Sequence, residues 1–311
     1  MTSLQKSLSD YLALRRSLGF KLSREGMWLP HFVRAIEQAG SPYVTSRIAV
    51  SWAEGPKSPP PNSWSNRLRM ARKFAHYLHA RDPRHEIPIH EFAAPAHSRR
   101  FEPYLYTEQD VLALMTEAKK LCRVPSKGET YSAVIGLLAA TGMRVGEVIA
   151  LDRSDFDSCQ GVLQVRKTKF GKSRQILLDP TTTQALLDYA KKRDRQVLRP
   201  SSPAFFPSSN GTRLIHANFH FIFHKMVSAV GLDRATPQRP RIHDLRHTFA
   251  VKTLTSWYRA GVDIGPRLPA LSTYLGHVSP SSTYVYLHAT PELLQQARRR
   301  LEKAQSQGVC S

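Results

Sequence analysis

The sequence has few cysteines, no long apolar run and few acidic residues. Its three cysteines, Cys122, Cys159 and Cys310, are odd in number, far apart and without a CxxC pair, which argues against a disulfide framework and against a zinc ribbon. The longest apolar run, Ala133 to Ala140, is far shorter than the roughly 20 residues that a membrane span needs. The N-terminus shows scattered charges and no apolar signal-peptide segment, so we expect a cytoplasmic protein.

The shortage of acidic residues leaves a large positive charge. The 311 residues include 45 Lys and Arg against 24 Asp and Glu, a formal net charge of +21. Residues 1–100 hold 16 basic and 7 acidic residues, and residues 101–311 hold 29 and 17. An excess spread over both halves indicates an extended polyanion as partner, most simply duplex DNA. The alternative is a cationic surface that serves only solubility.

Length and composition predict a globular chain of two domains. Hydrophobic residues make up 41% of the sequence, an ordinary globular share, and the length suits two domains. We expect a helical DNA-binding domain over 1–95, a linker over 96–106, a second domain over 107–290, and a C-terminal helix or tail over 291–311.

Helical periodicity organises the first domain. The apolar spacing from Leu4 to Leu18 predicts one helix and that from Trp28 to Ala39 a second, while the proline-rich stretch Gly55 to Trp64 predicts a loop. A third helix is expected over Ser65–Ala80. Its basic side chains are Arg67, Arg69, Arg72 and Lys73. They could lie along a phosphate backbone, although a solvent-exposed polar face explains them equally well.

The second domain reads as mostly helical with one β-hairpin. It opens with an apolar helix over Tyr131–Ala140, and strands at Gly161–Arg166 and Arg174–Leu178 flank a turn at Thr168–Lys172. The fold class is therefore mainly α with a small hairpin or sheet. Further helices are expected at about 181–196, 216–230, 243–258, 267–275 and 291–305.

Four separated pieces carry the residues suited to chemistry. They are Arg144 with Glu147, Lys169 in the hairpin turn, the run His243-Asp244-Leu245-Arg246-His247, and Leu275-Gly276-His277 followed nine positions later by Tyr286. Taken singly, each has an ordinary structural explanation: an ion pair, a solvated lysine, a packed histidine or a packed tyrosine. Their order and spacing together are far more specific.

This order resembles the tyrosine recombinase (phage integrase) family over residues 105–290. The turn from Thr168 to Arg174 is similar to the one that carries the family's catalytic lysine, and the stretch Leu275–Tyr286 looks most like recombinases of bacterial transposons and other mobile elements. The resemblance implies a helical, SAM-like core-binding domain and a mixed α/β catalytic domain that form a C-shaped clamp on DNA.

The chemistry of a phosphodiester suits these residues. Attack on phosphorus develops charge on the nonbridging oxygens, which Arg144 and Arg246 can hold bidentately. A phenol such as Tyr286 can form a covalent phosphotyrosine that conserves the bond energy, so no ATP is needed. No carboxylate cluster suits two Mg²⁺ ions, and His243 and His247 share a zinc spacing without a clear third ligand. We expect neither metal nor cofactor.

The resemblance also implies a role for each residue. Tyr286 would form a 3′-phosphotyrosyl link and Lys169 would protonate the leaving 5′ oxygen. His243 and His277 would bond the phosphate or assist proton transfer. Glu147 would orient Arg144 or His243.

Two assignments leave alternatives open. Tyr284 lies two residues from Tyr286, but the spacing from the Leu-Gly-His motif favours Tyr286. Lys172 is the alternative to Lys169, whereas Lys167 suits a phosphate or base contact.

The charge and the resemblance together predict the partners. The expected partners are double-stranded recombination sites, sister recombinases and copies of the chain itself. We expect a tetramer on DNA and a monomer or weak dimer when free. The expected location is the bacterial nucleoid, away from membranes. The segment Pro291–Lys303 could pack on its own domain or dock on a neighbouring subunit. The expected DNA contacts are Arg67, Arg69, Arg72, Lys73, Arg99, Arg100, Lys167, Lys172, Arg174 and Arg241.

Two rival functions remain. A type IB topoisomerase shares the Arg/Lys/Arg/His/Tyr chemistry but would relax supercoils as a monomer. A regulator or accessory protein with the same fold would bind DNA without cleaving it, and the intact set of residues argues against it. Site-specific recombination for integration or excision of a mobile element is the function we expect.

Overall fold

The computed structural model of the chain describes residues 4–55, 61–89, 103–122, 124–166, 173–196, 201–234, 239–277 and 281–288, together with residue 298. It divides into two compact units, Met1–Phe101 and Glu102–Ser311, so the division falls inside the segment expected as a linker. Each unit has a hydrophobic core of its own. The two are described separately below.

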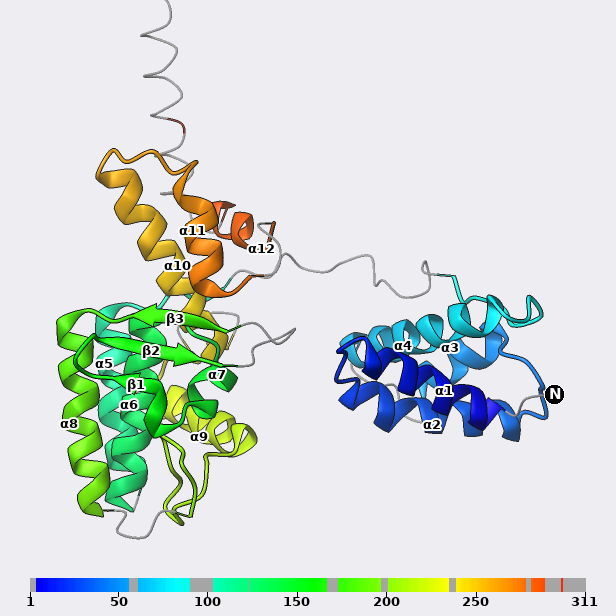
Figure 1. The fold of residues 1–311 in the computed structure, drawn as a ribbon, viewed down its shortest axis with the longest axis horizontal. Helices are drawn as coiled ribbons and strands as arrows, with labels where there is room; N and C mark the ends of the chain where they lie inside the picture. The colour runs from blue at the N-terminus through cyan, green and yellow to red at the C-terminus, as the bar shows by residue number, and fades with distance from the viewer. Residues whose placement is uncertain are drawn as a thin grey trace, which may run out of the picture. The chain divides into compact units, whose positions relative to one another are not determined.

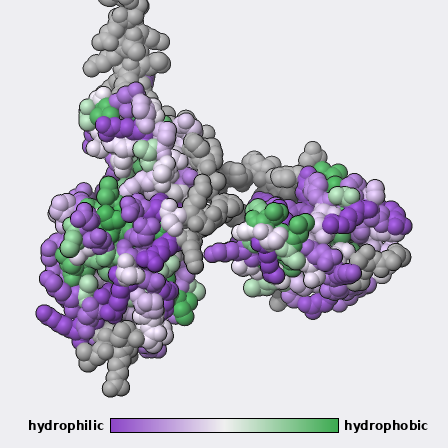
Figure 2. Space-filling view, viewed as in Figure 1, coloured by the Kyte–Doolittle hydropathy of each residue, from purple (hydrophilic) through white to green (hydrophobic). Residues whose placement is uncertain are grey.

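The first unit is a small helical bundle in its described part (Figure 1). Apolar side chains from all its helices pack into one core, with Leu29, Phe32 and Phe74 fully buried. Figure 2 shows hydrophilic residues over much of the visible face of this unit, with apolar ones between them. The helices are α1 (Leu4–Ser17), α2 (Ser23–Gln38), α3 (Ser46–Glu54) and α4 (Pro61–His79).

Two helix starts and one whole helix in the first unit differ from the sequence-based expectation. Helix α2 begins at Ser23 rather than Trp28 because its first turn is polar and carries no apolar period. Helix α4 begins at Pro61, so the end of the expected loop is helical; proline suits a first helical position, where its missing N–H needs no partner. Helix α3 was not anticipated. Its N-cap is Thr45, whose hydroxyl accepts from the Ile48 N–H at 3.3 Å.

The second unit begins with helices and a small antiparallel sheet. The strand order is β1-β2-β3, and Val165 pairs with Arg174 next to segment 167–172, which lies outside the described residues. The first strand was not anticipated. The elements are α5 (Glu108–Leu121), α6 (Pro125–Thr141), α7 (Val145–Ala150), η2 (Arg153–Asp155), β1 (Phe156–Asp157), β2 (Val162–Val165), β3 (Arg174–Leu177) and α8 (Pro180–Gln196).

Helices complete the second unit. Helix α6 packs against α5, α8 and α10 (Figure 1). The start of α10 belongs to the main core through Ile242 and Leu245, whereas its later residues join a smaller apolar cluster with α11 and Tyr286. The junction of these two cores holds the polar site. The elements are α9 (His216–Ala229), α10 (Ile242–Arg259), α11 (Arg267–Leu275), α12 (Ser281–Tyr284) and η4 (Val285–His288).

The fold class is confirmed as mainly helical with a small sheet. No helix in the described ranges has the length and apolar character that crossing a membrane requires. The helix expected over 291–305 falls outside the described residues, apart from Arg298.

Candidate active site

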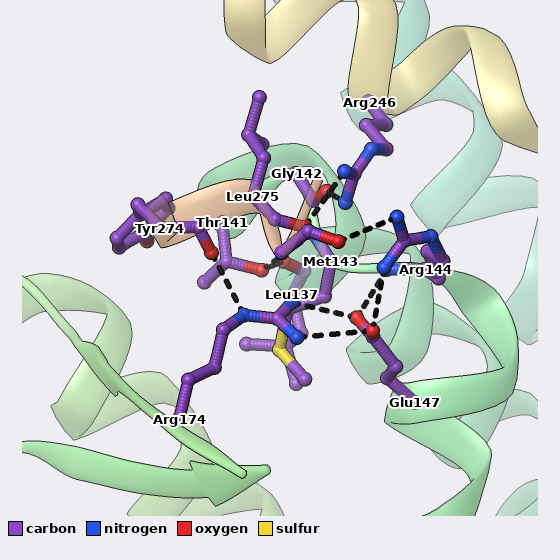
Figure 3. A network of polar contacts seen from close by, with 11 residues as sticks. Leu137, Thr141, Gly142, Met143, Arg144, Glu147, Arg174, Arg246, Tyr274 and Leu275 are labelled. Carbon is purple, nitrogen blue, oxygen red and sulfur yellow. Dashed lines mark hydrogen bonds and ion pairs between the residues drawn. The ribbon is translucent and has the colours of Figure 1, made fainter. Parts of the chain in front are cut away.

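The C-terminus of α11 gathers three arginines. The carbonyls of residues 274–276 accept hydrogen bonds, in that order, from Arg174 Nε at 2.8 Å, Arg246 Nη2 at 2.7 Å and Arg144 Nη2 at 2.9 Å (Figure 3). The last carbonyls of a helix lack intrahelical partners and carry the negative end of its dipole. Guanidinium groups from three separate elements therefore converge on one helix end.

Arg246 is the buried charge of this cluster. Its side chain comes from α10, the residue is only 2% exposed, and Nη1 also donates to the Gly142 carbonyl at 2.9 Å. Gly142 ends α6 at φ 62°, and a Cβ there would lie 2.5 Å from the Phe249 ring. Burial, and then the charge of Arg144, lower the pKa of Arg246 to about 10, with opposing contributions from Tyr286 and Glu147. The guanidinium still carries its charge at neutral pH.

Glu147 is shared by two arginines. Its Oε1 accepts from Arg144 Nη1 and Arg174 Nη1, both at 3.0 Å, and its Oε2 accepts from Arg174 Nη2 at 2.8 Å and the Arg144 backbone N–H at 3.0 Å. Burial acts to raise the pKa of Glu147, but hydrogen bonds and charges from both arginines outweigh it, so the pKa is lowered. The carboxylate is ionised, and the three groups together carry one net positive charge.

Tyr286 lies beside Arg246 of this cluster. It is 3% exposed, its ring is stacked 5.9 Å from that of His277, and the His247 ring is 5.2 Å away. Its hydroxyl acts on the Arg246 guanidinium by charge and hydrogen bonding. The neighbouring Tyr284 is 50% exposed. Of the two tyrosines, the geometry therefore favours Tyr286 as the group that can reach a phosphate held by the arginines.

His277, which is stacked beside this tyrosine, is neutral at neutral pH. Burial, followed by the neighbouring positive charges, lowers the pKa of His277 to about 4. His243 is exposed, and partial desolvation and then the charge of His247 lower its pKa. His277 Nδ1 lies 2.8 Å from the Thr283 hydroxyl, so this contact does not use Nε2. Neutral imidazoles can accept a proton or donate a hydrogen bond.

Comparison with known proteins agrees with this geometry. Residues 105–292 match the model of the phage integrase family. An integrase/recombinase of Sinorhizobium fredii named y4rB is 38% identical over 309 residues, which are 97% of this chain and 98% of that protein. The chain belongs to the phage integrase family. It is a tyrosine-type recombinase, as the order of its motifs predicts.

A further relative is similar in sequence, and a solved structure shares the fold. Tyrosine recombinase XerD of Pseudomonas putida is 28% identical over 94% of this chain and 91% of its own length. The Tn1549 transposon integrase, solved in complex with transposon right end DNA, superposes with a TM-score of 0.66 at 20% identity, over 95% of this chain and 99% of that one. At that identity, the superposition shows the shared fold.

The structure brings five of the six expected catalytic residues of this integrase close together. Electrostatic contacts link His243, Arg246, Arg144 and His277, and Tyr286 packs beside them. The sixth, Lys169, lies outside the described residues, as do four expected DNA contacts: Lys167, Lys172, Arg99 and Arg100.

Arg174 requires a correction. It was expected to contact DNA, but its side chain is 10% exposed and bonds Glu147 and the Tyr274 carbonyl. These contacts turn the guanidinium into the protein. Glu147 bonds Arg144, one of its two expected partners.

The remaining expected DNA contacts divide between the two units. In α4, Arg67 lies 4.3 Å over the Trp28 ring, Arg69 and Lys73 are exposed, and Arg72 is half-buried. Their contacts with DNA remain predictions. In the second unit, Arg241 is 42% exposed and pairs with Asp244 at 3.0 Å.

The structure also bears on the alternative zinc site at His243 and His247. Asp244 accepts from the backbone N–H and the guanidinium of Arg241, which makes it a cap for α10. Within the ranges that the structure covers, no group of three or more His, Cys, Asp or Glu side chains is arranged to hold a metal.

Sequence reasoning missed three contributors to the site. Gly142 supplies a carbonyl to Arg246, Thr283 holds His277, and Arg174 holds Glu147. The Thr-Gly-x-Arg stretch at residues 141–144 was a usable signal for the first. Arg174 contacts Glu147 from 27 positions away and leaves no local pattern. Thr283 is only 6 positions from His277, but their contact follows no helical or strand period.

Proposed function

We propose that this integrase cleaves and rejoins duplex DNA at specific sites through a covalent bond between Tyr286 and a 3′ phosphate. The observation that carries the proposal is the position of Tyr286, buried against Arg246 and beside His277 at the helix end that also holds Arg144. A phosphate bound to the two arginines would meet the phenol oxygen in the same pocket.

Each group has a definite task in this reaction. Arg144 and Arg246 hold the nonbridging oxygens, since a guanidinium has five N–H groups and only some are used on the protein's carbonyls. A neutral His277 or His243 accepts the phenol proton as Tyr286 attacks. Lys169 donates a proton to the leaving 5′ oxygen. Reversal by a 5′ hydroxyl rejoins the strand and frees the tyrosine.

We assign this activity to the integration or excision of a mobile element. Support comes from the relative named integrase/recombinase and from the Tn1549 transposon integrase, which was solved with transposon right end DNA. The net charge of +21 suits a duplex partner. A tetramer of this chain, alone or with sister recombinases, would bring two DNA sites together.

The test is covalent trapping on DNA. Duplexes selected from a random library by the full chain are nicked so that a short fragment diffuses away after cleavage. The wild-type chain should then give a denaturant-resistant protein–DNA adduct. No adduct would support a DNA-binding regulator, and relaxation of a supercoiled plasmid without strand exchange would support a topoisomerase.

A further inference from the structure

Arg174 lies where three parts of the site meet. It is the first residue of β3, directly after the segment that carries Lys169. Its guanidinium bonds both oxygens of Glu147, near the start of α7, and the Tyr274 carbonyl near the end of α11. All three of its nitrogens are thus engaged with the protein, and its side chain is 10% exposed.

The arrangement of Glu147 explains why a second arginine is needed. A carboxylate that orients Arg144 also cancels that residue's charge when the two are alone. Here each oxygen of Glu147 accepts from both arginines, so the group of three keeps one positive charge. Of the two side chains, Arg144 is the more exposed at 36%, against 10% for Arg174. The inner arginine balances the carboxylate and the outer one faces the pocket.

The guanidinium of Arg174 packs closely against Gly276, where a side chain would not fit beside it. A Cβ on Gly276 would lie 2.7 Å from Arg174 Nη1, and Gly276 has a φ of +69°. A residue with a side chain at this position would be strained and would also displace the guanidinium. The glycine that precedes His277 therefore serves the seating of Arg174 as well as the turn.

We propose that Arg174 is a positioning residue for DNA cleavage, which holds Glu147 so that Arg144 is oriented toward the phosphate while the pocket keeps its positive charge. This rests on the proposed function. Arg174 touches neither the phosphate nor the leaving group, and acts through Glu147 and Arg144.

The test compares two lysine variants. Arg174→Lys keeps the charge, but one ammonium cannot bond both Glu147 oxygens and the Tyr274 carbonyl together. The chain offers a matched control in Arg193 of α8, which is 5% exposed and likewise bonds both oxygens of one carboxylate, Asp194, and one backbone carbonyl, that of Phe205. Arg193→Lys should lose a similar set of contacts outside the site.

The readout is the single-turnover rate of adduct formation on the nicked duplex, measured beside the Kd for the same DNA. Arg174→Lys should slow cleavage by about 100-fold while Kd changes by less than about threefold. Arg193→Lys should leave the cleavage rate of bound DNA unchanged. Arg174→Ala should regain cleavage when free guanidinium is added at millimolar concentration, because the ion can occupy the vacated place on Glu147.

A modified substrate separates the route through Arg144 from one through Lys169. When sulfur replaces the bridging 5′ oxygen, the leaving thiol has a pKa of about 8.5 and needs no general acid. Lys169→Ala should recover on this substrate and Arg174→Lys should not. Full recovery of Arg174→Lys, or cleavage equal to wild type on ordinary DNA, would overturn the proposal. Failure of the wild-type chain to form an adduct would instead overturn the proposed function.

Discussion

Arg246 combines full burial with a positive charge, and its two carbonyl contacts fix its direction. Lysine has one ammonium and cannot reach the Gly142 and Leu275 carbonyls together with a phosphate. We expect Arg246→Lys to lower the single-turnover cleavage rate by about 100- to 1000-fold, with little change in Kd. The rate is measured on the nicked duplex under saturating protein. A variant that binds poorly but cleaves its bound DNA normally would argue against a role at the phosphate.

The half-buried His277 predicts a pH dependence of stability. His277 has a pKa of about 4 in the folded chain, against about 6.5 when unfolded. Between these values the unfolded chain binds protons that the folded chain does not, so stability falls as pH drops through this window and is level above it. Urea unfolding at about pH 7 and about pH 5 should show this loss.

Replacing His277 tests whether the loss of stability at low pH comes from this histidine. His277→Gln should lose less stability between the two pH values than the wild type, whereas the same change at the exposed His216 should leave the difference as it was. An equal pH dependence in His277→Gln and the wild type would contradict the assignment.

At the scale of elements, the end of α11 organises the site. Gly276 and Gly261 both have positive φ, +69° and +70°, but only a Cβ at Gly276 meets another group, Arg174, at 2.7 Å. Alanine at either position should cost about 1 kcal/mol of stability from backbone strain. Only Gly276→Ala should also slow cleavage of bound DNA, by at least about tenfold. Equal cleavage by the two variants would show that the seating of Arg174 does not matter.

The sequence predicted elements better than the contacts between them. Helical spacing located α1, α8, α9, α10 and α11 because each presents an apolar face to a core. The starts of α2 and α4 were wrong because polar or proline-containing first turns carry no such period.

For the site residues too, local sequence patterns predict more than contacts between distant segments do. Arg144, Arg246 and Tyr286 stand in motifs of fixed spacing, so the family pattern predicts them as site residues, and the structure brings them together. The sequence predicts a DNA contact for Arg174, whereas its partners in the structure lie 27 and 100 positions away in the sequence. Nothing local in the sequence reports such contacts, and a basic residue beside a basic turn reads as a DNA contact.

At the scale of the whole molecule, the charge of +21 predicts binding dominated by phosphate contacts. Arg69 and Lys73 are exposed on α4 of the first unit. Replacing both by Gln should weaken binding to all sequences alike and reduce the slope of log K against log salt by about 1 for each lost contact. Arg34→Gln, at an exposed position on α2, is the control for loss of one charge. An unchanged slope in the α4 variant would exclude that helix from the interface.

The most direct test of the central claim is to locate the covalent bond. The adduct trapped on the nicked duplex is digested, and the DNA-linked peptide is sequenced by mass spectrometry. We predict a 3′ phosphate on Tyr286, and no adduct from Tyr286→Phe although that variant still binds the duplex. An adduct on Tyr284, or one that persists in Tyr286→Phe, would contradict the claim that the buried phenol beside Arg246 is the nucleophile.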